Sequence, residues 1–196
     1  MRRRLVLTVA LTDDAPVLLP LLRARATPEA FDSTRAVTEA EAASLVDAFR
    51  WAPSAGNSQP WGLLLAHRGD ATHERLVQRL APSSRRWAPQ AALLAVTAAY
   101  RFVDDDMPYS DFADYDLGQA VAHLTIQAEA LGLATHQFRA FDLDGLTRDL
   151  AVRQGWAIVS MIAIGHALTR QAQDTQERTR RTAEDVREAP WAALTK

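Results

Sequence analysis

The chain of 196 residues contains no cysteine and, apart from Lys196, no lysine. The absence of cysteine excludes a thiol nucleophile, an iron–sulfur cluster, cysteine-ligated zinc and any disulfide. The absence of lysine from the body of the chain excludes Schiff-base chemistry and the lysine of a phosphate-binding P-loop. An anion bound by this chain is therefore expected to meet arginine guanidinium groups and backbone amides.

The sequence also lacks a strong charge of one sign and a long hydrophobic run. Its formal net charge of −2 argues against a general nucleic-acid-binding protein. No apolar stretch approaches the roughly 20 residues of a membrane span. The apolar run at 5–11 is followed by Thr12-Asp13-Asp14 rather than by a signal-peptide cleavage site. We expect a cytoplasmic protein without a nucleic-acid or membrane partner.

Several motifs of known chemistry are missing as well. The chain has no Gly-x-Gly-x-x-Gly fingerprint of a dinucleotide-binding domain and no Gly-x-Ser-x-Gly elbow of a hydrolase. The five histidines show no metal-ligand spacing, so no metal site is predicted.

Helical and strand patterns alternate along most of the chain, without an internal repeat. Helices are predicted at 16–25, after the capping box Thr38–Glu41, around 73–80, from about 114 to the cap Gly132, and from about 142. Strands are predicted at 61–66, 91–99, 133–138 and 156–164. The alternation alone predicts one layered α/β-type domain. The polar stretch from Thr169 has too little apolar surface for its own core, so it is either disordered or wraps around a partner subunit.

The segment 52–61, Ala-Pro-Ser-Ala-Gly-Asn-Ser-Gln-Pro-Trp, separates a helix from a strand. Its prolines fix φ, its glycine permits positive φ, and its other side chains donate and accept hydrogen bonds. This composition is typical of a rigid polar loop. The alternative is a solvated turn that happens to contain a tryptophan.

Five elements of the chain resemble, in order, those of the nitroreductase family of FMN-dependent oxidoreductases. They are 25–32 (Arg-Ala-Thr-Pro-Glu-Ala-Phe-Asp), the loop 50–61, 115–120 (Tyr-Asp-Leu-Gly-Gln-Ala), 130–137 with 141–142, and 162–166 together with 178–181. The resemblance implies an α+β, nitroreductase-like sandwich with a central, mostly antiparallel sheet flanked by helices, in an obligate intertwined homodimer. Residues 1–168 would form the flavin-binding domain, and 169–196 an extension that packs on the partner subunit.

The resemblance also implies which residues bind FMN at the subunit interface. One chain would supply Arg25, Ala26, Thr27 and Glu29, and the C-terminal segment would add Arg178, Arg180 and Arg181 at the phosphate. The other chain would line the flavin with Pro53, Ser54, Ala55 and Asn57. Arg139 and Ala140 would lie near flavin N5. Guanidinium and hydroxyl groups suit a phosphate dianion. Taken alone, Arg25 is a surface arginine at a helix end, and 178–181 is a solvated tail.

The chain departs from the family's pattern at three positions. Glu29 stands where the family usually has a cation that stabilises the anionic reduced flavin. Arg139 stands where many members have Gly or Glu, and Ala140 replaces a common glycine. We hypothesise that Glu29 and Arg139 form a swapped pair in which Arg139 supplies the missing cation. The alternative is that both are solvated.

The activity implied is hydride transfer from NADH or NADPH through flavin N5 to a nitroaromatic, quinone or enone acceptor by a ping-pong mechanism. No catalytic acid or base is assigned. The substrate pocket is expected around 107–113, lined by Tyr109 and Phe112 unless these pack in the core. Two alternatives remain: an FMN-dependent tailoring dehydrogenase or oxidase of a small natural product, and a non-catalytic flavin-binding protein.

Overall fold

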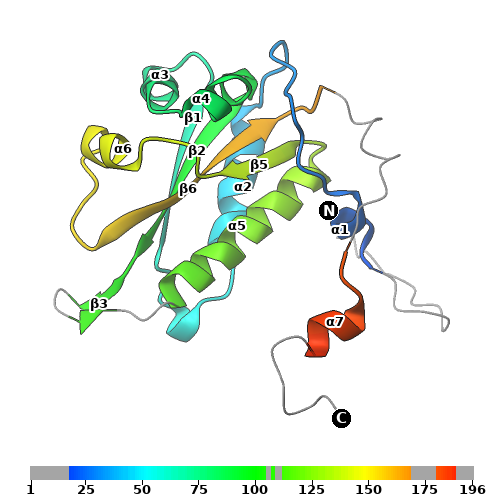
Figure 1. Ribbon diagram of the computed structural model, residues 1–196, viewed down its shortest axis with the longest axis vertical. Helices are drawn as coiled ribbons and strands as arrows, with labels where there is room; N and C mark the ends of the chain where they lie inside the picture. The colour runs from blue at the N-terminus through cyan, green and yellow to red at the C-terminus, as the bar shows by residue number, and fades with distance from the viewer. Residues whose placement is uncertain (1–17, 105–106, 109–111, 169–179, 189–196) are drawn as a thin grey trace, which may run out of the picture.

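The computed structural model describes residues 18–104, 107–108, 112–168 and 180–188 (Figure 1). The helices are α1 (Pro20–Ala24), α2 (Glu39–Arg50), α3 (Ala71–Gln78), α4 (Pro82–Arg85), α5 (Phe112–Ala130), α6 (Leu143–Asp149) and α7 (Ala183–Glu188), with 3-10 turns at Ala55–Asn57 and Ala88–Gln90. The strands are β1 (Trp61–His67), β2 (Leu93–Tyr100), β3 (Phe102–Asp104), β4 (Met107–Pro108), β5 (Ala134–Phe138) and β6 (Trp156–Gly165). None of the helices in these ranges is long and apolar enough to cross a membrane.

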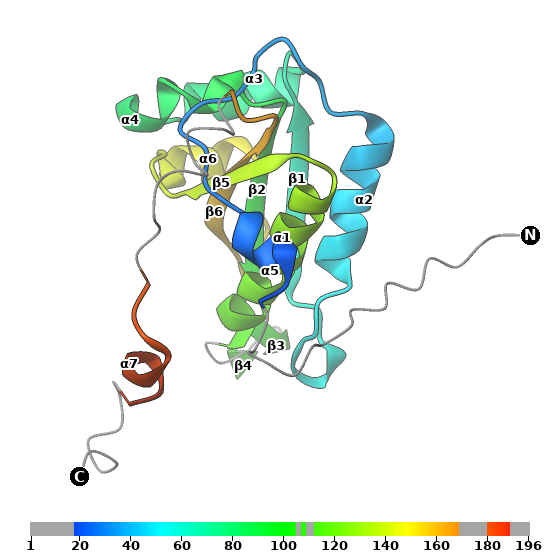
Figure 2. The same ribbon diagram turned by 90° about the vertical axis from the view of Figure 1, so that its right-hand side faces the viewer.

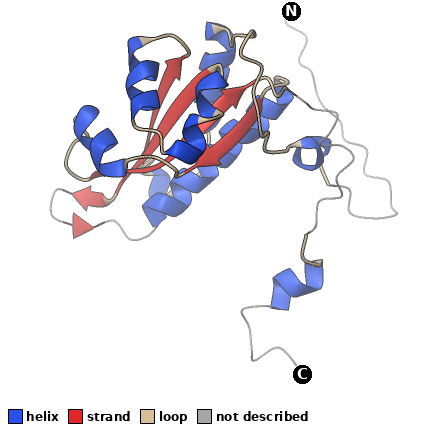
Figure 3. Ribbon diagram, turned by 45° about the horizontal axis from the view of Figure 1, so that its top comes forward, coloured by secondary structure: helices blue, strands red, loops and turns tan. Residues whose placement is uncertain are grey.

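Four strands form the central sheet in the order β1-β2-β6-β5, and every neighbouring pair is antiparallel (Figure 3). Val96 lies opposite Leu64 on one side and Met161 on the other, so β2 is an interior strand. The α+β sheet is therefore confirmed, whereas the α/β-type domain predicted from alternation is wrong. An alternation of helix and strand patterns fixes the order of elements but not the direction in which each strand runs.

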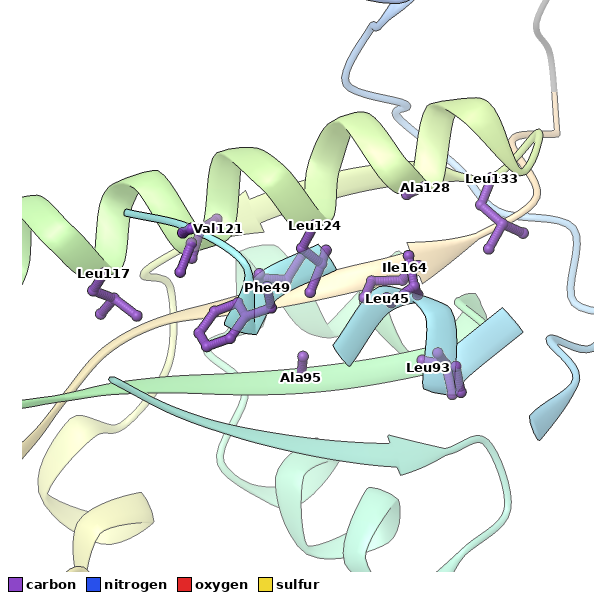
Figure 4. Close-up of a cluster of buried hydrophobic side chains, with 14 of the residues drawn as sticks. Leu45, Phe49, Leu93, Ala95, Leu117, Val121, Leu124, Ala128, Leu133 and Ile164 are labelled. Atoms are coloured by element: carbon purple, nitrogen blue, oxygen red, sulfur yellow. The ribbon is translucent and has the colours of Figure 1, made fainter. Parts of the chain in front are cut away.

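Helices cover both faces of the sheet because side chains along each strand point alternately to opposite faces. On one face, Leu93 and Ile164 belong to a core that the sheet forms with α2 and α5 (Figure 4). Leu94 and Met161 contact the other core, with α3 and α6. The first core includes the fully buried Leu45, Leu117 and Leu124. Burying each such leucine stabilises the fold by about 1.5–3 kcal/mol.

The helix ends confirm two predicted signals, the capping box and the cap Gly132, and show one cap that was not predicted, Asp142. The Thr38 hydroxyl accepts the Glu41 amide, and the Glu41 carboxylate accepts the Thr38 amide, so the capping box is complete. Gly132 follows α5 with φ +75°, a conformation in which glycine is the least strained residue. Asp142 caps α6 by accepting the Gly145 amide.

The chain differs from the predicted elements at its short segments. Of the helix predicted at 16–25, the described part is helical only from Pro20, because a residue that precedes proline, here Leu19, adopts an extended conformation. α4, β3 and β4 were not predicted because two to four residues carry no measurable period. α7 was also not predicted, although Thr182 and Asp185 cap it through side-chain bonds to each other's amides. Figure 1 shows α7 set apart from the sheet.

Candidate functional site

The polar loop between α2 and β1 is tightly shaped. Gly56, Asn57 and Gln59 have φ of 57°, 56° and 50°, in the left-handed region that strains non-glycine residues. The Gln59 amide donates to the Ser54 hydroxyl at 3.0 Å and the Asn57 amide donates to the Ser54 carbonyl at 3.0 Å. Within the loop, all side chains but that of Ser54 are exposed from 53 to 59. The predicted rigid polar loop is therefore present, with its polar surface turned outward.

A buried carboxylate lies beneath this loop. Asp116, on α5, is 1% exposed. One of its oxygens accepts the Ala55 amide at 2.9 Å, and the other accepts the side-chain amide of Gln119 at 3.3 Å. Sequence reasoning missed Asp116. The signal that could have found it is its position on the apolar face of the helix, next to Leu117.

The second predicted group, 25–29, lies against strand β5. Arg25 is half-buried, and its guanidinium donates to the Thr27 hydroxyl at 3.3 Å. The Pro28 carbonyl lies 2.9 Å from Nδ1 of His136, whose ring stacks on Trp87 with centroids 4.0 Å apart. The His136 contact and stack were not predicted. The contact with Pro28 joins the 25–29 segment to the sheet, and the stack holds the His136 ring against Trp87.

Arg139 and Ala140 follow β5 directly. The Ala140 carbonyl accepts the Ala81 amide at 3.0 Å and the Ser84 hydroxyl. In the described part of the chain, neither residue's own backbone amide donates a hydrogen bond. Arg139 lies three residues beyond His136, which is about 10 Å along a strand. The structure therefore brings 25–29 and 139–140 to the same strand.

The turn that carries these amides is held by ion pairs. The Arg79 guanidinium donates to Asp149 at 2.6 and 2.8 Å and to Asp142 at 3.2 Å. The bonds from Arg79 lower the pKa of Asp149, and the Gly145 amide together with Arg79 lowers the pKa of Asp142. Both carboxylates therefore stay ionised to lower pH than a free aspartate, and Asp142 anchors the chain two residues after Ala140.

Glu29 and Arg139 are both exposed, and the ion pairs of the described residues do not join them. They do not neutralise each other in this structure. Whether Arg139 supplies a cation to a flavin stays a prediction.

The remaining predicted residues are only partly described. Phe112 is 53% exposed at the start of α5, so its predicted alternative, core packing, is wrong. It meets Tyr115, 63% exposed, edge-on at 5.6 Å between ring centroids. Tyr109 and Arg178 lie outside the described residues. Arg180 and Arg181 are exposed just before α7, and their role at a phosphate stays a prediction.

The two predicted groups lie toward opposite ends of α5. Asp116 and the loop lie at its beginning, whereas α1 and the segment after it lie toward its end (Figure 1). A helix of 19 residues is about 28 Å long. One chain thus carries two separated halves of the predicted site and does not bring them together.

The helices α1, α2 and α5 lie beside one another (Figure 2), and their side chains line a groove of about 510 Å³. Its lining is mostly apolar: Leu19, Leu21, Leu22, Ala48, Trp51, Ala122, His123, Ile126 and Gln127. Trp51 is 74% exposed and Leu19 is 52% exposed.

One buried titratable group belongs to neither predicted group. His73, on α3, is 4% exposed, and its Nε2 atom has no hydrogen-bond partner among the described residues. Burial, and secondarily the nearby charge of Arg68, lowers the pKa of its ring. Among the described residues no three histidine, aspartate or glutamate side chains are grouped as a metal site.

Solved structures of other proteins have the same fold as this chain. The crystal structure of an oxidoreductase containing FMN superposes with a TM-score of 0.79 at 26% identity, covering 89% of this chain and 92% of that one. The FMN complex of a protein from Exiguobacterium sibiricum, described as a nitroreductase, superposes with a TM-score of 0.74 at 15% identity, covering 90% of this chain and 98% of that one. The fold is therefore nitroreductase-like.

The sequence comparisons identify the family. The sequence model of the nitroreductase family matches residues 22–166. A Streptomyces coelicolor protein, provisionally named NADH dehydrogenase/NAD(P)H nitroreductase, is 24% identical over 149 residues, which cover 66% of this chain and 73% of that protein. This chain belongs to the nitroreductase family.

Proposed function

We propose that this chain is an FMN-dependent oxidoreductase, with NADH or NADPH as donor and a nitroaromatic, quinone or enone as acceptor. The observation that carries the proposal is the arrangement at β5: the Arg25–Thr27 pair lies beside this strand, and the strand is followed by two backbone amides that donate no hydrogen bond to any described residue. Family membership and the FMN-containing neighbours support it.

The donor set fits FMN. A half-buried guanidinium bonded to a hydroxyl suits a phosphate. The backbone amides of Arg139 and Ala140, which donate to no described residue, suit a hydrogen-bond acceptor atom of a flavin ring. When bound, FMN supplies hydride acceptance at N5 and its donation to the acceptor in alternating half-reactions. The chain's own residues bind and orient the two ends, and no residue is assigned as a general acid or base.

We further propose that the site is completed by a second copy of this chain. The loop 53–57 is held at Asp116 near the start of α5, whereas the segment 25–29 is held at β5, which follows the end of α5 (Figure 1), so a second copy would bring a loop to the segment. The apolar groove between α1, α2 and α5 supplies a surface for this second copy. Burying its leucines and Trp51 would stabilise a homodimer.

The first test is the visible absorbance of the purified protein, with identification of the compound that it releases on denaturation. We expect a yellow protein that releases about one FMN per chain. Arg25→Ala should weaken FMN binding, whereas Arg86→Ala, which removes an exposed arginine from the end of α4, should not. A colourless protein that takes up no added FMN would contradict the proposal.

A second candidate function also uses FMN but does not use NADH or NADPH as the electron donor. Glu29 is exposed and joined to no cation by the ion pairs of the described residues. A carboxylate in place of a cation favours a tailoring dehydrogenase that oxidises a small natural product and returns electrons to oxygen. Anaerobic titration with NADH and with NADPH separates the two, because bleaching of the flavin absorbance by either donor would exclude the dehydrogenase.

A further inference from the structure

Asp116 is a polar group at a place that α5 otherwise fills with apolar side chains. It is 1% exposed, and Ala113, Leu117 and Ala120 on the same helix are buried around it. A carboxylate removed from water is tolerated only where hydrogen bonds compensate for the lost hydration. Of its two bonds, one holds Gln119 on its own helix and the other leaves the helix for the Ala55 amide. The contact with the loop is therefore the one that joins two elements.

The loop that receives this bond has a conformation that its sequence does not favour. Asn57 and Gln59 adopt positive φ although neither is glycine, and such residues persist only where surrounding contacts hold them. Ser54 holds the end of the turn through the Gln59 amide. Asp116 holds its beginning, because Ala55 is the first residue of the 3-10 turn.

We propose that Asp116 is a positioning residue: its buried carboxylate fixes the 53–59 loop in the shape in which the loop binds the flavin of the partner subunit. This inference rests on the proposed function. Asp116 lies under the loop and acts through the Ala55 amide, so it does not itself reach the flavin. Its removal frees the loop and leaves the phosphate half of the site, 25–29 on β5, unchanged.

The affinity for FMN, followed by quenching of flavin fluorescence, measures this role in the apoprotein reconstituted with FMN. Asp116→Ala should raise the Kd for FMN at least about tenfold, as expected for loss of a charge-assisted hydrogen bond. Asp116→Asn keeps an oxygen for the Ala55 amide, and Gln119 can reverse its own amide, so the Kd should stay within about threefold of wild type. Gln119→Ala, which removes only the bond on the helix, is the matched control and should also stay within about threefold.

A merely structural role would give a different pattern. If Asp116 only stabilised the fold, Asp116→Ala would lower Tm without changing the Kd for FMN or the visible circular dichroism of bound FMN. That result would overturn the inference. Asp116→Ser, a smaller change, takes the place of Asp116→Ala if the alanine variant does not fold, with the same expected result.

Mixed dimers test whether the loop acts on the partner's site. Two differently tagged chains, one with Arg25→Ala and one with Asp116→Ala, are co-expressed and purified through both tags. If the loop acts across the interface, one of the two FMN sites carries both substitutions and the second site carries neither. The mixed dimer then binds one FMN per two chains at wild-type affinity. If each loop served its own chain, both sites would carry one defect and no site of wild-type affinity would appear, which would overturn the inference.

The failure of this inference is distinct from the failure of the proposed function. Wild-type protein that binds no FMN would refute both. Wild-type protein that binds FMN, with an Asp116→Ala variant of equal affinity, would refute the positioning role alone.

Discussion

The buried His73 makes the stability of this protein depend on pH. In the part of the chain that the structure describes, Nε2 of His73 has no hydrogen-bond partner, and the residue is 4% exposed, so protonation would place an uncompensated charge in the core. Because burial lowers the pKa of His73 in the folded state, the unfolded chain binds the proton more readily. The free energy of unfolding should therefore be highest above the ordinary histidine pKa of about 6.5 and fall as the pH drops below it.

The magnitude follows from linkage. One extra proton on the unfolded chain lowers the free energy of unfolding by up to about 1.4 kcal/mol for each pH unit below about 6.5, until the folded-state pKa is reached. His73→Leu removes the group and should flatten this part of the profile. At pH 8 the variant should be at least as stable as wild type, because an unpartnered buried nitrogen costs about 1–3 kcal/mol.

Urea unfolding of both proteins at half-unit steps from pH 8 to pH 5 measures the difference. His166, whose pKa is also lowered by burial, is present in both proteins, so its contribution cancels. Leu76→Ala, at a fully buried apolar position on the same helix, is the control and should lower stability equally at every pH. Parallel profiles for wild type and His73→Leu, with a constant offset across this range, would refute the reasoning.

Three further changes test the fold that positions the site. Leu124→Ala, at a fully buried position of α5, should reduce the free energy of unfolding by about 2–5 kcal/mol in urea titration, and a loss below 1 kcal/mol would contradict the packing. Thr38→Ala removes the hydroxyl of the capping box and should lower the free energy of unfolding by about 1 kcal/mol in the same titration, whereas Thr38→Ser keeps a hydroxyl and should stay close to wild type. Gly132→Ala should lower the free energy of unfolding by about 1–2 kcal/mol because of the φ of +75° alone, since a Cβ at this position meets no atom within 4 Å. An unchanged Tm would show that the turn relaxes.

The elements of the fold could largely be predicted because they depend on periodic burial. Leu45 and Phe49 recur at helical spacing on α2, and Leu117, Val121 and Leu124 do so on α5. The direction of the strands could not be predicted from alternation alone. It depends on which edges pair across the whole sheet, and no local pattern encodes that.

Two segments of the candidate site have a local geometry that suits their prediction, whereas their binding of FMN stays a prediction. The sequence predicts the rigid polar loop, and the structure contains it. The hydrogen bond between Arg25 and Thr27 was not predicted. Asp116 was missed because a single carboxylate in a helix ordinarily faces solvent. The contact of His136 with Pro28 joins residues 108 positions apart in the chain, a relation that spacing does not reveal.

The position of α5 between the two half-sites has a consequence for insertions and deletions. Adding one residue to an α-helix moves everything beyond it by about 1.5 Å and rotates it by about 100°. Within α5, such a change would turn the buried face away from the sheet and also misalign the loop end with the end near α1. Many substitutions on the exposed face of α5 should be tolerated, whereas its length of 19 residues should not vary.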